Sequence, residues 1–203
     1  MNLGENIHNA FQVVFETYKS IEKLIQNCNH EYNREKYYMP ADRFMRNANS
    51  SSWEGFCYWS FILLYQRKED GPVLENGWIN APVYAVEISV DSDTCEEPMI
   101  YIAKMDFNDL TNWGRGCSNG DHEKFYDAIH AQYYLDEIEK GEGIVEIRPK
   151  ITYEEKVADT FWGLEKIICS EIKLVDVTKE NYKEKIFGEI ERLKDEGDKE
   201  WQS

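Results

Sequence analysis

The first thirty residues carry apolar side chains at helical spacing. Seven of these positions are separated alternately by four and three residues: Ile7, Phe11, Val14, Tyr18, Ile21, Ile25 and Cys28. This spacing places one apolar stripe along an α-helix. Leu3, Ala10 and Leu24 widen the stripe, and a stripe of this breadth is typical of a helix that packs on a sheet. A narrower seam between two helices is the alternative interpretation.

The middle of the chain changes to a period of two. Residues 53–66 are apolar on both alternating sets, which predicts a central strand that is covered on both faces. Residues 83–90 and 99–107 also alternate between the two faces of a strand. The polar stretch 91–98 joins these two segments, so we expect an antiparallel hairpin.

Helical spacing returns after a glycine-rich loop at residues 113–120. The apolar stripe of this second helix is formed by Phe125, Ile129, Gln132 and Leu135 or Ile138. Gly141 is a stop signal for a helix, and we expect the helix to end there. Residues 143–148 then predict a short strand, which ends at Pro149.

Residues 152–168 suit either a helix or a strand. Thr152 and Glu155 form a capping-box pair, which favours a helix. The β-branched pair Ile167 and Ile168 favours a strand instead. We expect a helix to about Glu165 and then a strand across residues 171–177.

The order of these segments predicts the fold class. Thr178 can cap a last helix, and the polar tail of residues 195–203 is expected to fray. Consecutive strands without intervening helices favour a mainly antiparallel sheet. We therefore expect an α+β fold in a single domain over residues 1–203. It would have a sheet of about five strands, with an N-terminal, a central and a C-terminal helix packed on it.

Charge narrows the range of partners. The chain has 39 acids and 23 bases, a net charge of −16, which opposes direct binding to nucleic acid or to an anionic membrane. Residues 69–109 contain ten acids and one base, Lys104. The expected hairpin tip holds four acids, Asp91, Asp93, Glu96 and Glu97. These acids would attract a basic protein surface, such as that of a nucleic-acid-handling enzyme; a solvated turn is the alternative.

Trp113 is the aromatic candidate for a binding surface. It lies in the glycine-rich loop, where a large ring can anchor an interface. Burial in the core is the competing interpretation for any single ring of this kind. We therefore count Trp113, with the four tip acids, as a predicted partner-binding residue.

Cysteine and histidine spacing gives no metal or nucleophile motif. The five cysteines include no C-x-x-C pair, which favours free thiols in a reducing cytoplasm. The first residues do not resemble a signal peptide, so we expect a cytoplasmic location. His122 and His130 lie about 80° apart on a helix, and we expect both at the surface. No cofactor and no metal site are predicted.

An enzymatic alternative comes from the order of the elements. Residues 5–148 are similar in element order to the core of PD-(D/E)xK nucleases, in which hairpin carboxylates bind magnesium and a lysine assists the attacking water. The resemblance implies Glu87, Asp91, Lys104 and Asp106 as catalytic residues. Ile102 stands where the second carboxylate is expected, which removes a metal ligand from the pattern.

These observations favour an acidic protein-binding module over an enzyme. The most concrete form of this hypothesis is an inhibitor or immunity-type protein that occludes a basic, nucleic-acid-handling site on its partner. A metal-dependent hydrolase with a degenerate nuclease core is the alternative. The oligomeric state stays open.

Overall fold

The computed structural model describes residues 2–41, 43–47, 57–90, 96–130 and 133–197. Its helices are α1 (Leu3–Cys28), α2 (Glu31–Lys36), α3 (His122–His130), α4 (Glu154–Thr160) and α5 (Glu189–Gly197), the last of which continues a π-helical segment, Lys183–Gly188. Its strands are β1 (Tyr37–Tyr38), β2 (Met45–Arg46), β3 (Ser60–Arg67), β4 (Val83–Ser89), β5 (Met99–Phe107), β6 (Leu135–Gly141), β7 (Ile144–Pro149) and β8 (Leu164–Lys173). No helix among the described residues is long and apolar enough to cross a membrane.

The strands form one antiparallel sheet. Among the described residues the sheet has eight strands in the order β1-β3-β4-β5-β8-β7-β6, with β2 also paired to β3. The predicted α+β class is confirmed, whereas the predicted count of about five strands is too low. The difference arises from β6, which was expected to be helical, and from the two-residue strands β1 and β2, which are too short to produce a periodic pattern.

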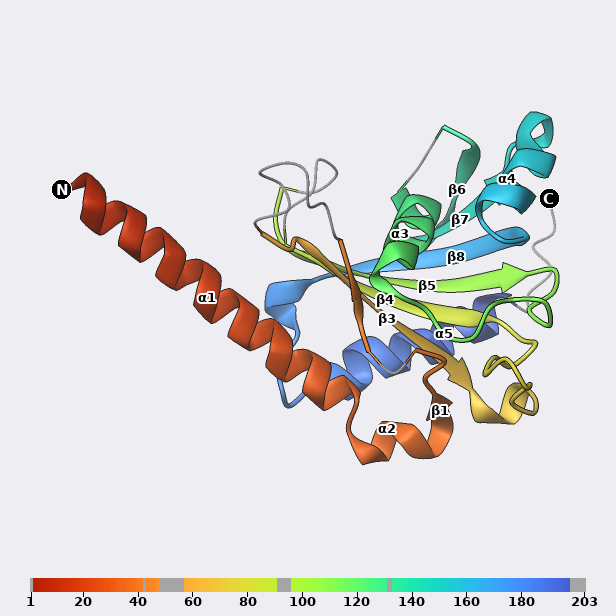
Figure 1. Cartoon of the computed structure of the whole chain (residues 1–203), viewed down its shortest axis with the longest axis horizontal. Helices are drawn as coiled ribbons and strands as arrows, with labels where there is room; N and C mark the ends of the chain where they lie inside the picture. Colours follow the sequence, from red (N-terminus) through yellow and green to blue (C-terminus); the bar gives the residue numbers. More distant parts are fainter. Residues whose placement is uncertain (1, 42, 48–56, 91–95, 131–132, 198–203) are drawn as a thin grey trace.

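Helices cover both faces of the sheet (Figure 1). The face that we call the α3 face packs against α3 and α4, through Phe125, Ala128 and Val157. The opposite face, the α5 face, packs against the C-terminal helix and the C-terminal end of α1. The β4–β5 hairpin is antiparallel, as predicted, and places Glu87 opposite Tyr101.

The central strand β3 is buried on both faces, as predicted. Every residue of Ser60–Arg67 is buried, because even-numbered side chains such as Ile62 join the α3 face and odd-numbered ones such as Leu63 join the α5 face. The strand begins at Ser60 rather than at residue 53. Residues 57–59 are not in a strand, and residues 53–56 lie outside the described part of the chain.

Helix α1 overhangs the sheet. Only Ile21, Leu24, Ile25 and Cys28 of α1 are buried, so the expectation that the whole stripe packs on the sheet is wrong. A helix of 26 residues is about 39 Å long, whereas a strand of seven to nine residues spans about 23–31 Å. The N-terminal half of α1 therefore projects beyond the sheet (Figure 1).

The predicted helix to Gly141 is also wrong in its second half. Helix α3 ends at His130, and residues 135–141 form strand β6, paired with β7. Glu142 and Gly143 both have positive φ, 54° and 73°, and they connect paired residues Gly141 and Ile144. Two consecutive residues with positive φ make the type I′ turn that suits a two-residue hairpin. The glycines therefore mark a hairpin rather than a helix end.

The ambiguous segment divides into a helix followed by a strand. Helix α4 follows a 3-10 turn, Ile151–Tyr153, and ends at Thr160, while β8 spans Leu164–Lys173. The predicted order of helix and strand is confirmed, but the helix ends before Glu165 and the strand begins well before residue 171. The reason is tertiary: β8 lies between β5 and β7 in the sheet, where the β-branched pair Ile167 and Ile168 is buried on opposite faces.

The hairpin turn generates a stability prediction. Replacing Glu142 by Asn should raise the free energy of unfolding by about 0.5–1 kcal/mol, because Asn tolerates positive φ and Asn-Gly is a preferred type I′ pair. Urea denaturation of the two proteins measures the change. Glu139→Asn, within β6 of the same hairpin, is the control and should not stabilise the protein, since Asn is unfavourable in strands. An unchanged or lower stability for Glu142→Asn would contradict the turn assignment.

Candidate binding groove and a buried polar network

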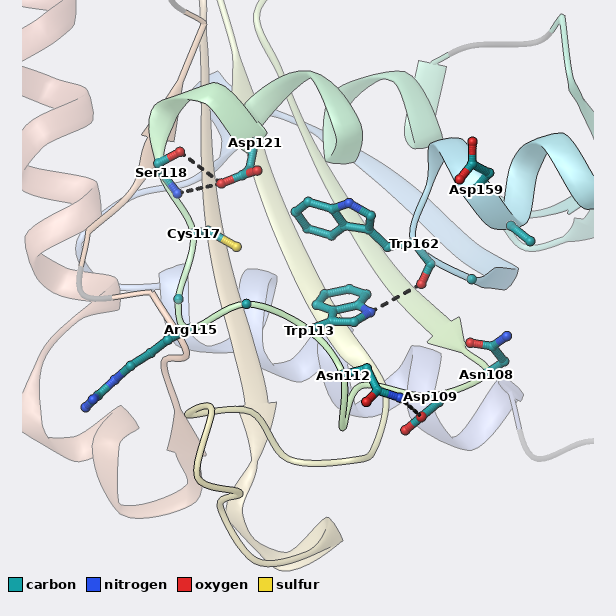
Figure 2. Close-up of a pocket in the computed structure, with 14 residues that line it drawn as sticks. Asn108, Asp109, Asn112, Trp113, Arg115, Cys117, Ser118, Asp121, Asp159 and Trp162 are labelled. Carbon is teal, nitrogen blue, oxygen red and sulfur yellow. Dashed lines mark hydrogen bonds between the residues drawn. The ribbon is translucent and has the colours of Figure 1, made fainter.

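A groove opens at the end of the sheet where β5 finishes (Figure 2). It lies between the loop that joins β5 to α3, which includes the 3-10 turn Asn119–Asp121, and the end of α4, and it has a cavity volume of about 860 Å³. Side chains with polar groups or large rings line it: Asn108, Asp109, Asn112, Trp113, Arg115, Cys117, Ser118, Asp121, Asp159 and Trp162. Gly114, Gly116 and Gly163 let its backbone approach closely. The volume is in the range of sites that hold a small ligand or a side-chain cluster of a partner.

Two indole rings meet in the groove. The ring centroids of Trp113 and Trp162 are 4.9 Å apart, at an interplanar angle of 66°, and Figure 2 shows one ring above the other. Trp113 Nε1 donates to the carbonyl oxygen of Trp162, at 3.3 Å. Trp113 also packs edge to face on Trp78 and Phe107, while its side chain stays half exposed. The predicted partner-binding residue is therefore held rigidly at a concave surface.

The backbone of Trp162 adopts a conformation that is rare for a bulky residue. Its φ is 54°, and it occupies the left-handed position just after α4, which glycine usually takes. Gly163 N donates to Ala158 O at 2.7 Å, the six-to-one bond of a Schellman motif. A left-handed residue with a Cβ costs about 1–2 kcal/mol. Contacts elsewhere in the fold must outweigh this cost at Trp162, the residue whose indole lines the groove.

Gly163 is required beside Trp162. Its φ is 82°, and a Cβ added there would lie 2.2 Å from Asn108 Oδ1. Asn108 N also donates to Gly163 O at 2.9 Å. This close approach joins the end of β5 to the start of β8 and sets the width of the groove at this end.

Three aspartates surround the indoles. Asp109 accepts bonds from the hydroxyl and backbone of Thr111 and from Asn112, and these bonds lower the pKa of the Asp109 carboxyl. Asp121 accepts hydrogen bonds from the backbone N–H and the hydroxyl of Ser118, the N-cap residue of a capping box. Asp159 is exposed. Because the only basic lining residue is Arg115, the described lining has an excess of negative charge.

A cation already sits on one of the rings. The ammonium nitrogen of Lys124 lies 3.6 Å from the centroid of Trp162, well within cation–π range. Burial, with Asp121 adding to it, raises the pKa of the Cys117 thiol to about 12, so this thiol is protonated at neutral pH. The indole face and the aspartates of the groove can bind cationic groups.

The described tip acids, Glu96 and Glu97, lie at the far end of β5 from the groove. Asp91 and Asp93 fall outside the described residues. Glu96 and Glu97 are exposed, and Glu97 pairs with Lys173 at 2.5 Å. They precede β5, whereas the groove follows it, so a nine-residue strand of about 30 Å separates the two features. The structure does not bring Trp113 and the described tip acids into one compact patch.

The residues of the nuclease alternative face opposite ways. Glu87 points to the α3 face, while Lys104 pairs with Tyr84 across β4 and β5 and points to the α5 face. Asp106 lies on the same side as Lys104, at 3.6 Å from its Nζ, and also pairs with Lys166. Asp91 is not among the described residues. The described members of this set therefore do not converge on one metal or substrate.

Glu87 belongs instead to a buried network. Its side chain is fully buried, and it accepts from Ser60 Oγ at 2.8 Å and pairs with His130 Nε2 at 2.7 Å. His122 Nε2 lies 2.9 Å from the same Ser60 oxygen. Since Ser60 donates its only proton to Glu87, His122 is the donor in this contact. The expectation that both histidines lie at the surface is wrong, because α3 turns them toward the sheet.

The second ring nitrogen of His122, Nδ1, is buried and has no hydrogen-bond partner within the described residues. Burial, and then the neighbouring His130, lower the pKa of His122 to about 4. The ring is therefore neutral at pH 7, stacked on Tyr126 and edge to face with Trp59. This network anchors both ends of α3, and with it one wall of the groove.

Sequence reasoning missed Trp162, His122 and His130 as members of these sites. The Trp162-Gly163 pair before a β-branched run was the available signal for a helix end. The histidines gave no local signal, since Ser60 and Glu87 are about 30 to 70 residues away in the chain. No family model matches this chain, and neither does any curated protein or any solved structure.

The His122 environment predicts a pH dependence of stability. The unfolded side chain has a pKa of about 6.5, and the folded one a pKa of about 4. Between these values the unfolded state binds the proton and the folded state does not, so stability falls as the pH drops from 6.5 to 4. The full effect is about 3 kcal/mol. His122→Gln, which retains a donor toward Ser60, should show a smaller loss over this range.

Urea denaturation at several pH values measures both proteins. The comparison separates His122 from the carboxylates, because these titrate in both proteins alike. Equal slopes for the two proteins between pH 6.5 and 4 would contradict a buried, neutral His122.

Proposed function

We propose that the protein is a binding module for a basic surface of another protein, and that the groove between Trp113 and Trp162 receives part of that surface. The observation that carries the proposal is the composition of the groove, which has two rigid indoles inside a concave site and aspartates around them. Tryptophan, tyrosine and arginine are the residues that most often dominate binding energy at interfaces.

A basic side chain fits this site by two kinds of contact. Its cation can lie on an indole face, as Lys124 already does on Trp162, and it can pair with the exposed carboxylate of Asp159. An arginine suits such a site better than a lysine, because its planar guanidinium both stacks and forms paired hydrogen bonds. Displacement of Lys124 by the partner's cation would keep the ring face occupied.

The acids outside the groove would act at longer range. The net charge of −16, together with the predicted cluster of Asp91, Asp93, Glu96 and Glu97 between β4 and β5 in the sequence, would speed the encounter with a basic partner. Short-range contacts in the groove would slow dissociation. The finer proposal is an inhibitor or immunity-type protein, because nucleic-acid-handling sites are lined with Lys and Arg and an acidic protein can occlude them.

The test begins with a tagged protein that captures its partner from native lysate, followed by binding kinetics with the purified partner. Trp162→Gly should raise the dissociation rate about 30-fold or more, the loss expected of an interface hot spot. Glycine keeps the left-handed backbone at this position, and circular dichroism confirms that the variant is folded. An unchanged dissociation rate would remove the groove from the interface.

Neutralising the four tip acids tests the charge component. Asp91→Asn, Asp93→Asn, Glu96→Gln and Glu97→Gln together should lower the association rate several-fold and reduce its dependence on salt. The control removes the same charge from four exposed acids elsewhere, Glu154, Glu155, Asp176 and Glu180. Equal effects of the two quadruple variants would assign the acceleration to net charge rather than to the tip. If wild-type protein captures nothing basic, a screen for magnesium- or manganese-dependent hydrolysis tests the alternative.

A further inference from the structure

The projecting half of α1 exposes a continuous apolar stripe. Leu3, Ile7 and Phe11 are 73%, 52% and 55% exposed, although the same stripe is buried against the sheet at Ile21 and Ile25. A soluble protein rarely leaves large apolar side chains together in water unless they bind something. The stripe therefore packs against the sheet at its C-terminal end. At its N-terminal end it has no packing partner within the described residues.

The charges of this helical segment lie away from the stripe. Residues 3–18 contain two acids, Glu5 and Glu16, and no lysine or arginine. At 100° per residue, Glu5 and Glu16 lie about 160° and 180° around the helix from Ile7. The positions that flank the stripe on one side are Ala10 and Thr17, which are small enough to let another helix approach closely.

Apolar clefts on both sides of α1 extend this surface toward the sheet. One, with a volume of about 700 Å³, is lined mainly by aromatic side chains such as Phe15, Tyr18 and Phe61, and also by Lys19, Glu22 and Arg43. The other, of about 630 Å³, is lined mainly by apolar side chains such as Val13, Leu174 and Val175, and also by Glu16. The clefts extend the apolar surface from α1 onto neighbouring elements, and a stable interface needs such breadth, because it buries about 1,200 Å² or more in total.

We propose that this surface pairs with its counterpart on a second copy of the chain, with the two α1 helices antiparallel about a two-fold axis. Such interfaces are self-complementary, and two-fold dimers are the commonest oligomers. The stripe and the small residues beside it, Ala10 and Thr17, would contact the same residues of the second copy, and no like charges would meet along this contact. A basic partner, in contrast, would find no carboxylate along the stripe to pair with.

Charge also selects the antiparallel arrangement. Each chain carries a net charge of −16, and a parallel pair would set the two acidic bodies side by side. An antiparallel pair places them at opposite ends of the helices, because each body lies at the C-terminal end of its own α1 (Figure 1). The tip of each helix would then end beside the apolar clefts of the other copy.

Analytical ultracentrifugation of the full chain tests the proposal. Wild-type protein should sediment with twice the chain mass of 24.0 kDa. Ile7→Glu with Phe11→Glu should sediment as a monomer, since both carboxylates would face the partner helix. The matched control is Asn9→Glu with Lys23→Gln, two exposed positions outside both clefts. It makes the net charge more negative by the same two units on the opposite side of the same helix and should remain a dimer. Far-UV circular dichroism establishes that α1 is helical in each protein.

Two further measurements distinguish the outcomes. Amide hydrogen exchange of residues 3–18 should slow as protein concentration rises in the wild type and not in the Ile7/Phe11 variant. Small-angle scattering should give an elongated dimer, whereas a compact one would overturn the antiparallel arrangement. A wild-type monomer at high concentration would overturn the pairing itself, as would a control pair that dissociates as readily as the stripe variant. None of these results depends on the binding groove.

Discussion

The arrangement of the α3 face depends on one buried carboxylate. Glu87 lies at full burial on β4, and it is stabilised only because Ser60 and His130 both bind it. An unpaired charge at such a depth would cost several kcal/mol. Satisfying it requires α3 to lie over the sheet with His130 turned inward, and His122 then reaches the same serine one helix length away. The network thereby sets the position of α3 along the strands.

The position of α3 on the sheet determines the geometry of the groove. Its walls are the turn that leads into α3 and the end of α4, and two indoles lie between them beside the close contact of Gly163 with Asn108. The left-handed backbone of Trp162 is a local cost that the surrounding contacts must outweigh. Rings held in this way lose little conformational freedom on binding, which is the general advantage of a preorganised interface.

The sheet and α1 impose a second constraint. A helix longer than the strands beneath it must leave part of its apolar stripe uncovered, and here the uncovered part is the N-terminal half. Binding through the groove and pairing through α1 use different parts of the chain. A dimer of this kind would present two grooves, so a partner with repeated basic sites would gain affinity from both.

The sequence by itself determined the elements whose patterns are local. The β4–β5 hairpin, the doubly buried β3, β7 and the helical stripe of α1 all follow from spacing, because period and burial are linked within a few residues. It also nominated Trp113, which lies in the groove. Local patterns did not distinguish the Gly141–Gly143 hairpin from a helix end, since glycine serves both.

Only the tertiary structure decided which side chains meet. Strand register places Glu87 and Lys104 on opposite faces of the sheet. The resemblance to a nuclease core implied instead that these two residues of one hairpin act at a common site. The fold of α3 over β3 and β4 brought His122, His130, Ser60 and Glu87 together across long stretches of chain. How far α1 extends beyond the sheet depends on strand length and on the path of the chain. The apolar pattern of α1 predicts neither of these. Contacts between distant residues arise from packing, and one apolar pattern is compatible with many packings.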